Sequence, residues 1–136
     1  MLDLFDLQPW AILAAALAGT VIGAAWYSPL LFGKAWMAAL GKREDELGGQ
    51  GATIIGSMFS CLLSALGIAV FTGWFGVETA SGGATLGAFA GLTLVATAML
   101  SDSLFAGSGW RLYFIQAGSR VTCLVVMGAI LGGWPA

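Results

Sequence analysis

Four segments of this chain are each long and apolar enough to cross a lipid bilayer, and this feature limits the possible folds more than any other. Each segment exceeds the roughly 20 residues that a helix rising about 1.5 Å per residue needs to span a hydrocarbon core of about 30 Å. Only Asp102 and Arg120 place a charge inside them. The expected spans are residues 9–32, 52–76, 84–107 and 112–134. We therefore predict an all-α integral membrane protein, a bundle of four transmembrane helices.

Composition agrees with a membrane domain and excludes several other classes. The chain is 59% hydrophobic and 9% charged, whereas about a quarter of the residues of a soluble domain are charged. A net charge of -2 provides no basic patch for nucleic acid. The longest polar interval, residues 41–51, is too short to build a second core. We predict one membrane domain over residues 1–136, surrounded by membrane lipids and without a nucleic-acid partner.

The positive charges predict the orientation, because Lys and Arg accumulate in short cytoplasmic loops. Lys34, Lys42 and Arg43 lie between the first two spans, and Arg111 lies between the last two. Both basic loops fall on one side, so we expect a multi-pass protein of the bacterial inner membrane with both termini outside the cytoplasm. The first span is expected to remain in the membrane, since a cleaved signal peptide has its basic residues before the apolar stretch.

Two stretches resemble each other and suggest an internal repeat. Residues 56–62 read Gly-Ser-Met-Phe-Ser-Cys-Leu, and residues 118–124 read Gly-Ser-Arg-Val-Thr-Cys-Leu. With two spans in each half, a duplication predicts two parallel repeats about a pseudo-twofold axis along the membrane normal. The alternative is chance similarity, because these spans are composed largely of a few residue types, Gly, Ala, Ser and Leu. Cys61 and Cys123 occupy matching positions and could approach each other near this axis, where we expect packing rather than redox chemistry.

Small residues recur at every fourth position in the first and third spans. In lipid, such rows allow the close backbone approach on which helix association depends. We predict that the two rows face each other as the seam between the halves. The competing interpretation is that they point outward and hold a dimer or a partner subunit. The rows consist of Ala15, Gly19 and Gly23 in the first span and Gly83, Gly87 and Gly91 in the third.

Ser28-Pro29 should end the regular part of the first span, because proline lacks a backbone donor and disfavours helix in the residue before it. Residues 30–40 then mix large apolar residues with Lys34 and small residues, which is typical of a short helix in the membrane interface. We expect an interfacial anchor, with a docking surface for a partner as the alternative.

The same region carries a motif, Trp-Tyr-Ser-Pro-Leu-Leu-Phe-Gly-Lys-Ala-Trp over residues 26–36. Together with residues 112–118 and 127–134, it resembles the domain of unknown function 1761 family of small bacterial membrane proteins, over nearly the whole chain. The resemblance implies a four-span membrane protein without an assigned activity. The family often has Tyr-His near Ser119-Arg120, whereas this chain has no His, so any role of that imidazole is not carried over. The motif residues are Trp26, Tyr27, Ser28, Pro29, Phe32, Gly33, Lys34 and Trp36.

The residues needed for catalysis or metal binding are scarce. The chain has no His and two Cys, so it cannot assemble a catalytic triad or the usual ligand sets of zinc, haem or an iron-sulfur cluster. We expect a protein that is not an enzyme and has no cofactor and no metal site.

Asp102 and Arg120 are the most informative polar residues. They precede and follow the second cytoplasmic tip by similar numbers of residues, so antiparallel spans would place them at comparable depth, where they could pair directly. Tyr113 and Gln116 lie on the same helical face as Arg120 and complete a polar stripe. The stripe is either an ion or head-group site or a buried bridge that fixes how the helices meet.

These observations predict a non-enzymatic helical module, either a self-associating bundle or an accessory subunit of a larger membrane complex. The alternative is a minimal transporter or channel that uses the Asp102 and Arg120 stripe. A further alternative is a binding site for a lipid or another hydrophobic ligand, in a cleft lined by Trp26 and Tyr27.

Overall fold

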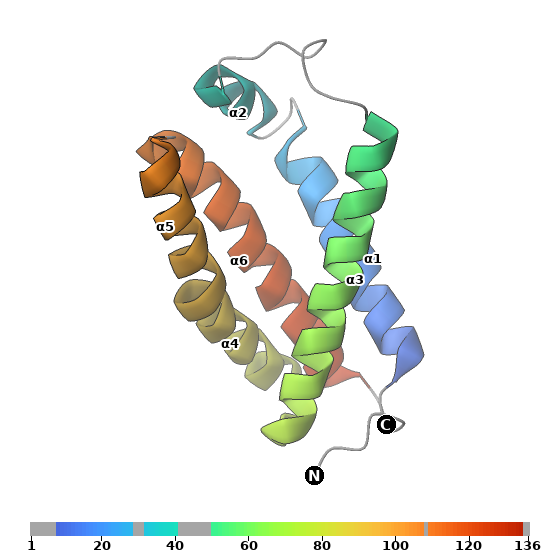
Figure 1. Cartoon of the computed structure of the whole chain (residues 1–136). Helices are drawn as coiled ribbons and strands as arrows, with labels where there is room; N and C mark the ends of the chain where they lie inside the picture. Colours follow the sequence, from blue (N-terminus) through green and yellow to red (C-terminus); the bar gives the residue numbers. More distant parts are fainter. Residues whose placement is uncertain (1–7, 29–31, 41–49, 108, 135–136) are drawn as a thin grey trace.

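The computed structural model describes residues 8–28, 32–40, 50–107 and 109–134. The prediction of a helical membrane protein is confirmed: four helices have the length and apolar character to span a membrane, and the described residues contain no strand. Figure 1 shows the helices running roughly along one common direction. The helical elements, in chain order, are α1 (Pro9–Trp26), α2 (Gly33–Leu40), α3 (Gln50–Trp74), α4 (Ala80–Ala90), the π-helical turn η3 (Gly91–Val95), α5 (Ala96–Ala106) and α6 (Trp110–Gly133).

Helix α1 ends at Trp26, earlier than the predicted boundary at residue 32. Beyond it the chain turns back through two backbone hydrogen bonds, from the Phe32 N–H to the Trp26 carbonyl and from the Gly33 N–H to the Ser28 carbonyl, both 2.9 Å. A Cβ atom at Gly33 would collide with the Tyr27 carbonyl, so only glycine fits this turn. Helix α2 therefore begins at Gly33, three residues after the predicted start of the interfacial helix.

The third span is a single long helix, α4–η3–α5, with a π-helical turn in its middle. It begins at Ala80, four residues before the predicted boundary, because the Thr79 hydroxyl caps it by accepting the Gly82 N–H at 3.0 Å. It ends at Ala106, and the next residue, Gly107, has a φ of 66°, the left-handed conformation typical of a helix C-terminus.

Helix α6 is central to the bundle. It packs most extensively on α4 and also contacts α1 and α3, whereas α3 and α4 touch little. Figure 1 shows α4, α5 and α6 on one side and α1 and α3 on the other, diverging toward the end that carries α2. We call this end of the bundle the α2 end.

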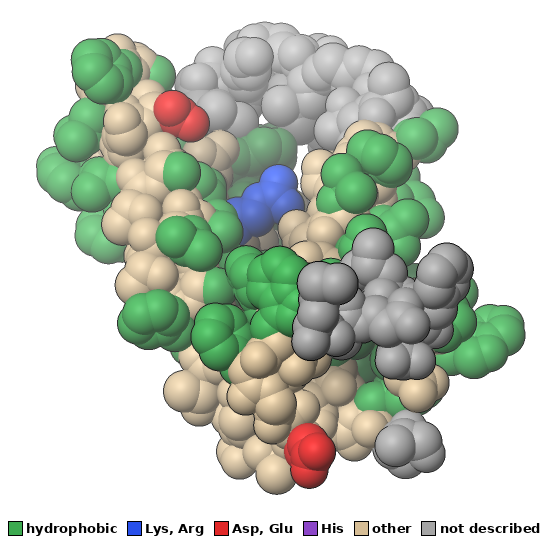
Figure 2. Space-filling view, turned by 60° about the horizontal axis from the view of Figure 1, so that its bottom comes forward, with side chains coloured by type: hydrophobic (Ala, Val, Ile, Leu, Met, Phe, Trp, Pro, Cys, Tyr) green, Lys and Arg blue, Asp and Glu red, His purple; other side chains and the backbone are tan. Residues whose placement is uncertain are grey.

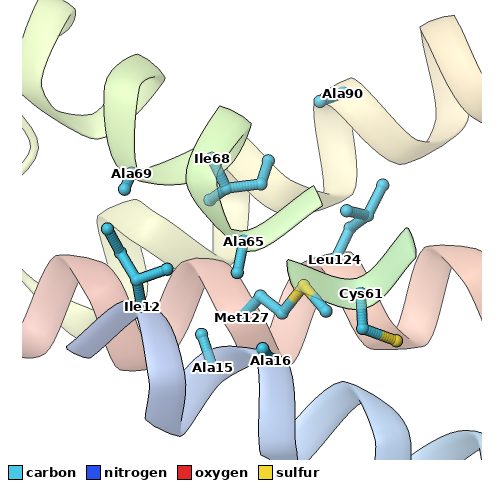
Figure 3. Packing of buried hydrophobic residues seen from close by; sticks show 10 residues of the cluster. All are labelled: Ile12, Ala15, Ala16, Cys61, Ala65, Ile68, Ala69, Ala90, Leu124 and Met127. Carbon is cyan, nitrogen blue, oxygen red and sulfur yellow. The ribbon is translucent and has the colours of Figure 1, made fainter. Parts of the chain in front are cut away.

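The core combines small side chains with a few larger ones, of which Met127 is the largest that is fully buried. Met127 of α6 is 1% exposed and extends between α1 and α3 (Figure 3). Ala15 and Ala65, on the helices that face it, are fully buried. Such small residues let three helices converge on one methionine, whose flexible side chain fills the space between them.

The glycine rows are contact surfaces, but the predicted pairing between them is wrong. A Cβ atom at Gly83 or Gly87 would collide with the backbone of α6, at the Gly128 and Leu124 carbonyls respectively. Gly19 instead meets side chains of α6 and α3, and Gly23 has open space around it. Because α6 lies between them, the rows of α1 and α4 each pack on α6 rather than on each other. The proposed duplication stays a prediction.

Candidate functional site

Asp102 and Arg120 do not pair within the chain. Both side chains are exposed, and no ion pair forms among the residues that the structure describes. Arg120 instead lines a pocket with Cys61 and Ser64 of α3 and Val95 of η3. The number of residues between each charge and the tip predicts its depth, but depth does not determine the direction in which a side chain points around its helix.

The rest of the predicted polar stripe has separate surroundings. The Tyr113 hydroxyl donates a hydrogen bond to the Ala96 carbonyl at 2.9 Å, which joins α6 to the first residue after the π-helical turn. Gln116 is half-buried on α6. Tyr113 therefore has a structural role, and Arg120 is left as the charged group of the candidate site.

The pocket around Arg120 lies between α3, η3 and α6 and has a volume of about 40 Å³. Figure 2 shows basic atoms set in a hollow among hydrophobic side chains, apart from the acidic side chains at the periphery. The pocket offers a guanidinium, a hydroxyl, two thiols and a thioether. Its lining residues are Cys61, Ser64, Val95, Arg120, Cys123, Leu124 and Met127.

Arg120 lies deep in its span. It follows Trp110 by ten residues along α6, which corresponds to about 15 Å of helix. A helical side chain leans toward the N-terminus of its own helix, which here is the α2 end. An uncompensated charge inside a membrane costs about 2.5 to 3.5 kcal/mol even on a lenient scale. A compensating anion is therefore expected near Arg120.

The family-motif residues attach the turn between α1 and α2 to α6 through a hydrogen bond and ring packing. The Trp26 indole donates a hydrogen bond from Nε1 to the Ile115 carbonyl at 2.9 Å. Its ring lies over Gly118, where a Cβ atom would come within 3.0 Å of it. Trp26 also contacts Phe32, with ring centroids 4.8 Å apart. The motif is thus a structural corner, in which the Trp26 ring fills space against α6.

The second ring pair of this corner is Tyr27 and Trp36, whose centroids are also 4.8 Å apart. The Trp36 Nε1 atom is buried and has no hydrogen-bond partner among the residues that the structure describes. Ser28 donates from Oγ to the Ala25 carbonyl at 2.7 Å, and Lys34 is exposed. Pro29 lies outside the described residues.

Tyr27 follows the last residue of α1, at the start of the corner. Burial raises the pKa of its hydroxyl above the usual range, while Ser119 and the positive charge of Arg120 lower this pKa in part. The phenol is therefore neutral at physiological pH.

Sequence reasoning did not anticipate two parts of this arrangement. Gly128 on α6 supplies the surface onto which α4 packs, although the stretch around it was read only as a family-like final span. Met127 joins Cys61 and Cys123 at one pocket. The matched positions of the two cysteines in the proposed repeat were the available signal for the second feature, and Met127 had none.

Comparison with known proteins gives one match. The model of a family described as "Protein of unknown function (DUF1761)" matches residues 10–132. No curated protein and no solved structure matches the chain.

Proposed function

The chain belongs to the DUF1761 family of proteins of unknown function, and we propose that it is a non-enzymatic helical membrane module that works as a self-associated bundle. The observation that carries the proposal is the pair of opposite charges, Asp102 and Arg120, which are exposed and unpaired within the described chain. We propose that Asp102 of one copy pairs with Arg120 of a second copy.

The heights of the two residues suit such a pair. Asp102 lies four residues before the end of α5, about 6 Å from the α2 end, and Arg120 leans toward the same end from its deeper position. A twofold axis along the membrane normal keeps both copies at equal height. It forms the same ion pair twice, as in other isologous interfaces. Each charge is then compensated by the opposite charge of the other copy, which removes the free-energy cost of an unpaired charge in lipid.

Helix α3 supplies a second argument for a partner. Residues 54–60 are all exposed, and Met58 and Phe59 among them share a groove with α1, so most of this half of the helix is left uncovered by the described chain. It contains Gly56, Ser57 and Ser60, and small or hydroxyl residues in membrane helices are typical of helix contacts. The exposed side of α5 just before Asp102 is also small and polar, with Thr97, Ala98 and Ser101, whereas the large residues Leu104 and Phe105 are exposed after it. An α5 helix from a second copy can therefore approach closely.

A charge exchange between copies tests the proposal. Asp102→Arg alone and Arg120→Asp alone each place like charges across both contacts, so each variant should fail to associate. When the two variants are expressed together with different affinity tags, one contact is native and the other is reversed. The two should then copurify from a mild detergent. Pairing within one chain, or binding of a lipid head group by Arg120, cannot produce this rescue.

Neutral variants provide the matched control. A mixture of Asp102→Asn with Arg120→Gln keeps only one of the two ion pairs, so it should yield a smaller amount of copurified complex than the charge-exchanged mixture. The proposal is wrong if differently tagged wild-type copies do not copurify, or if the charge-exchanged mixture associates no better than either variant alone. Association only with a different protein would support the accessory-subunit alternative instead.

A minimal transporter or channel is the second candidate, because Arg120 is exposed at a pocket within the membrane-spanning part of the bundle. In proteoliposomes, an anion flux that Arg120→Gln abolishes while the protein stays assembled would favour this function over the module.

A further inference from the structure

Three sulfur-containing side chains that the proposed function does not use converge on the pocket that Arg120 also lines. Cys61 of α3 and Cys123 and Met127 of α6 line the same space of about 40 Å³. Both cysteines are free thiols and 7% exposed, and Met127 is 1% exposed. We propose that these three residues form a binding site for a soft monovalent metal ion of the class of Cu(I) and Ag(I).

Gly19 of α1 is the point around which the sulfur side chains gather. The Cys123 thiol lies 3.5 Å from the Gly19 carbonyl oxygen, toward which it donates. A Cβ atom added to Gly19 would come within 3.4 Å of the Cys61 Sγ atom and would collide with the Met127 methyl group. Figure 3 shows Met127 extending between α1 and α3, with Cys61 beside its methyl end. The absence of a side chain at Gly19 thus leaves room for all three.

The donor set selects the kind of ion. Thiolate and thioether sulfurs prefer soft ions such as Cu(I), whereas hard cations such as Mg²⁺ and Ca²⁺ require oxygen ligands. The pocket holds one hydroxyl oxygen, from Ser64, and no carboxylate. Its volume exceeds the roughly 10 to 15 Å³ that one water molecule needs, so a single ion fits.

The charges at the pocket are consistent with such an ion. Binding replaces two S–H protons by one monovalent cation, M⁺ + 2 RSH → [M(SR)₂]⁻ + 2 H⁺, with no change of oxidation state. The site then carries one negative charge, and the Arg120 guanidinium lines the same pocket. A nearby cation favours thiolates. With five N–H donors, a guanidinium can face the metal site while another edge meets a carboxylate.

Silver ion, which needs no reductant to stay monovalent, is a suitable probe. Reduced, detergent-solubilised protein titrated with Ag⁺ against a competing small thiol should bind one ion per chain, as read by native mass spectrometry. Cys61→Ser and Cys123→Ser should each weaken binding by about 100-fold or more, because the second ligand of a chelate acts at high effective concentration. Met127→Leu should cause a smaller loss, and Met58→Leu, at an exposed position of α3, should cause none.

Helix content and elution volume of each variant show whether it has kept the fold. Where a Cys→Ser variant does not fold, the corresponding Cys→Ala variant replaces it. Two silver ions per chain, or unchanged affinity in either single-cysteine variant, would show that the thiols act independently and would overturn the site. Wild-type protein that binds silver but does not self-associate would contradict the proposed function and leave this site in place.

Discussion

At the residue scale, the structure depends on glycines that meet backbone rather than on large apolar side chains. Gly83 and Gly87 let α4 approach α6 until the backbones touch, and Gly33 permits the turn before α2. In lipid, where burial of apolar surface gives no drive between helices, such contacts supply dispersion and close packing. Individual glycines should therefore differ widely in how much stability they provide.

Gly87→Ala should destabilise the folded chain, because even a methyl group would collide with the Leu124 carbonyl and force α4 away from α6. We expect a loss of about 1 to 3 kcal/mol, typical of overpacking. Unfolding in mixed detergent, followed by circular dichroism, measures the difference.

Gly23→Ala is the matched control. It has open space around the new methyl group and should be neutral or slightly stabilising, since alanine favours helix. Equal effects at the two positions would contradict the assigned packing.

Trp26→Phe should also destabilise the protein, because it removes the hydrogen bond from the indole to the Ile115 carbonyl and the outer ring atoms that lie over Gly118. A loss of about 0.5 to 1.5 kcal/mol is expected for one such bond. The same unfolding assay applies, and Trp10→Phe, at an exposed position of α1, should leave stability unchanged.

At the element scale, the spans were predictable and their pairing was not. Helix existence follows from runs of apolar residues, and the end of α1 was expected at Ser28-Pro29, although the first span was drawn six residues too long. Helix pairing depends on which face of each span is turned inward, and apolar residues on all sides carry no such signal. Gly128 and Met127 on α6 were consequently missed, and Asp102 was assigned to Arg120 of its own chain.

The π-helical turn is a second feature at the element scale. It rotates the face that the third span presents after the turn relative to the face that it presents before the turn. Tyr113 holds the exit of this turn through its bond to the Ala96 carbonyl. Tyr113→Phe should increase hydrogen exchange of the amides around residues 96–100 and leave those of α1 unchanged. Unchanged exchange on both helices would show that this bond does not hold the turn.

At the scale of the whole molecule, α6 joins two groups of helices that diverge toward the α2 end (Figure 1), and Figure 2 shows basic atoms in a hollow of the bundle. Lys34 is exposed on α2, and Glu78 is exposed near the opposite end of the bundle. The predicted orientation places Lys34 in the cytoplasm and Glu78 outside.

Single cysteines at Lys34 and Glu78, in a background lacking Cys61 and Cys123, should therefore react differently with an impermeant thiol reagent in intact cells. Labelling is expected at residue 78 alone. Labelling at residue 34 from outside would reverse the orientation without changing the fold.

The central claim, that Asp102 and Arg120 meet between copies, is tested most directly by cross-linking. Differently tagged chains carrying Asp102→Cys and Arg120→Cys, each lacking Cys61 and Cys123, are expressed together and oxidised in the membrane. A disulfide-linked species of twice the 13.9 kDa chain mass, containing both tags, is expected. It should exceed the amount formed when Leu13→Cys, at an exposed position of α1, replaces Asp102→Cys. A third variant carries both cysteines on one chain. A cross-link within this variant, with none between the differently tagged chains, would contradict the account.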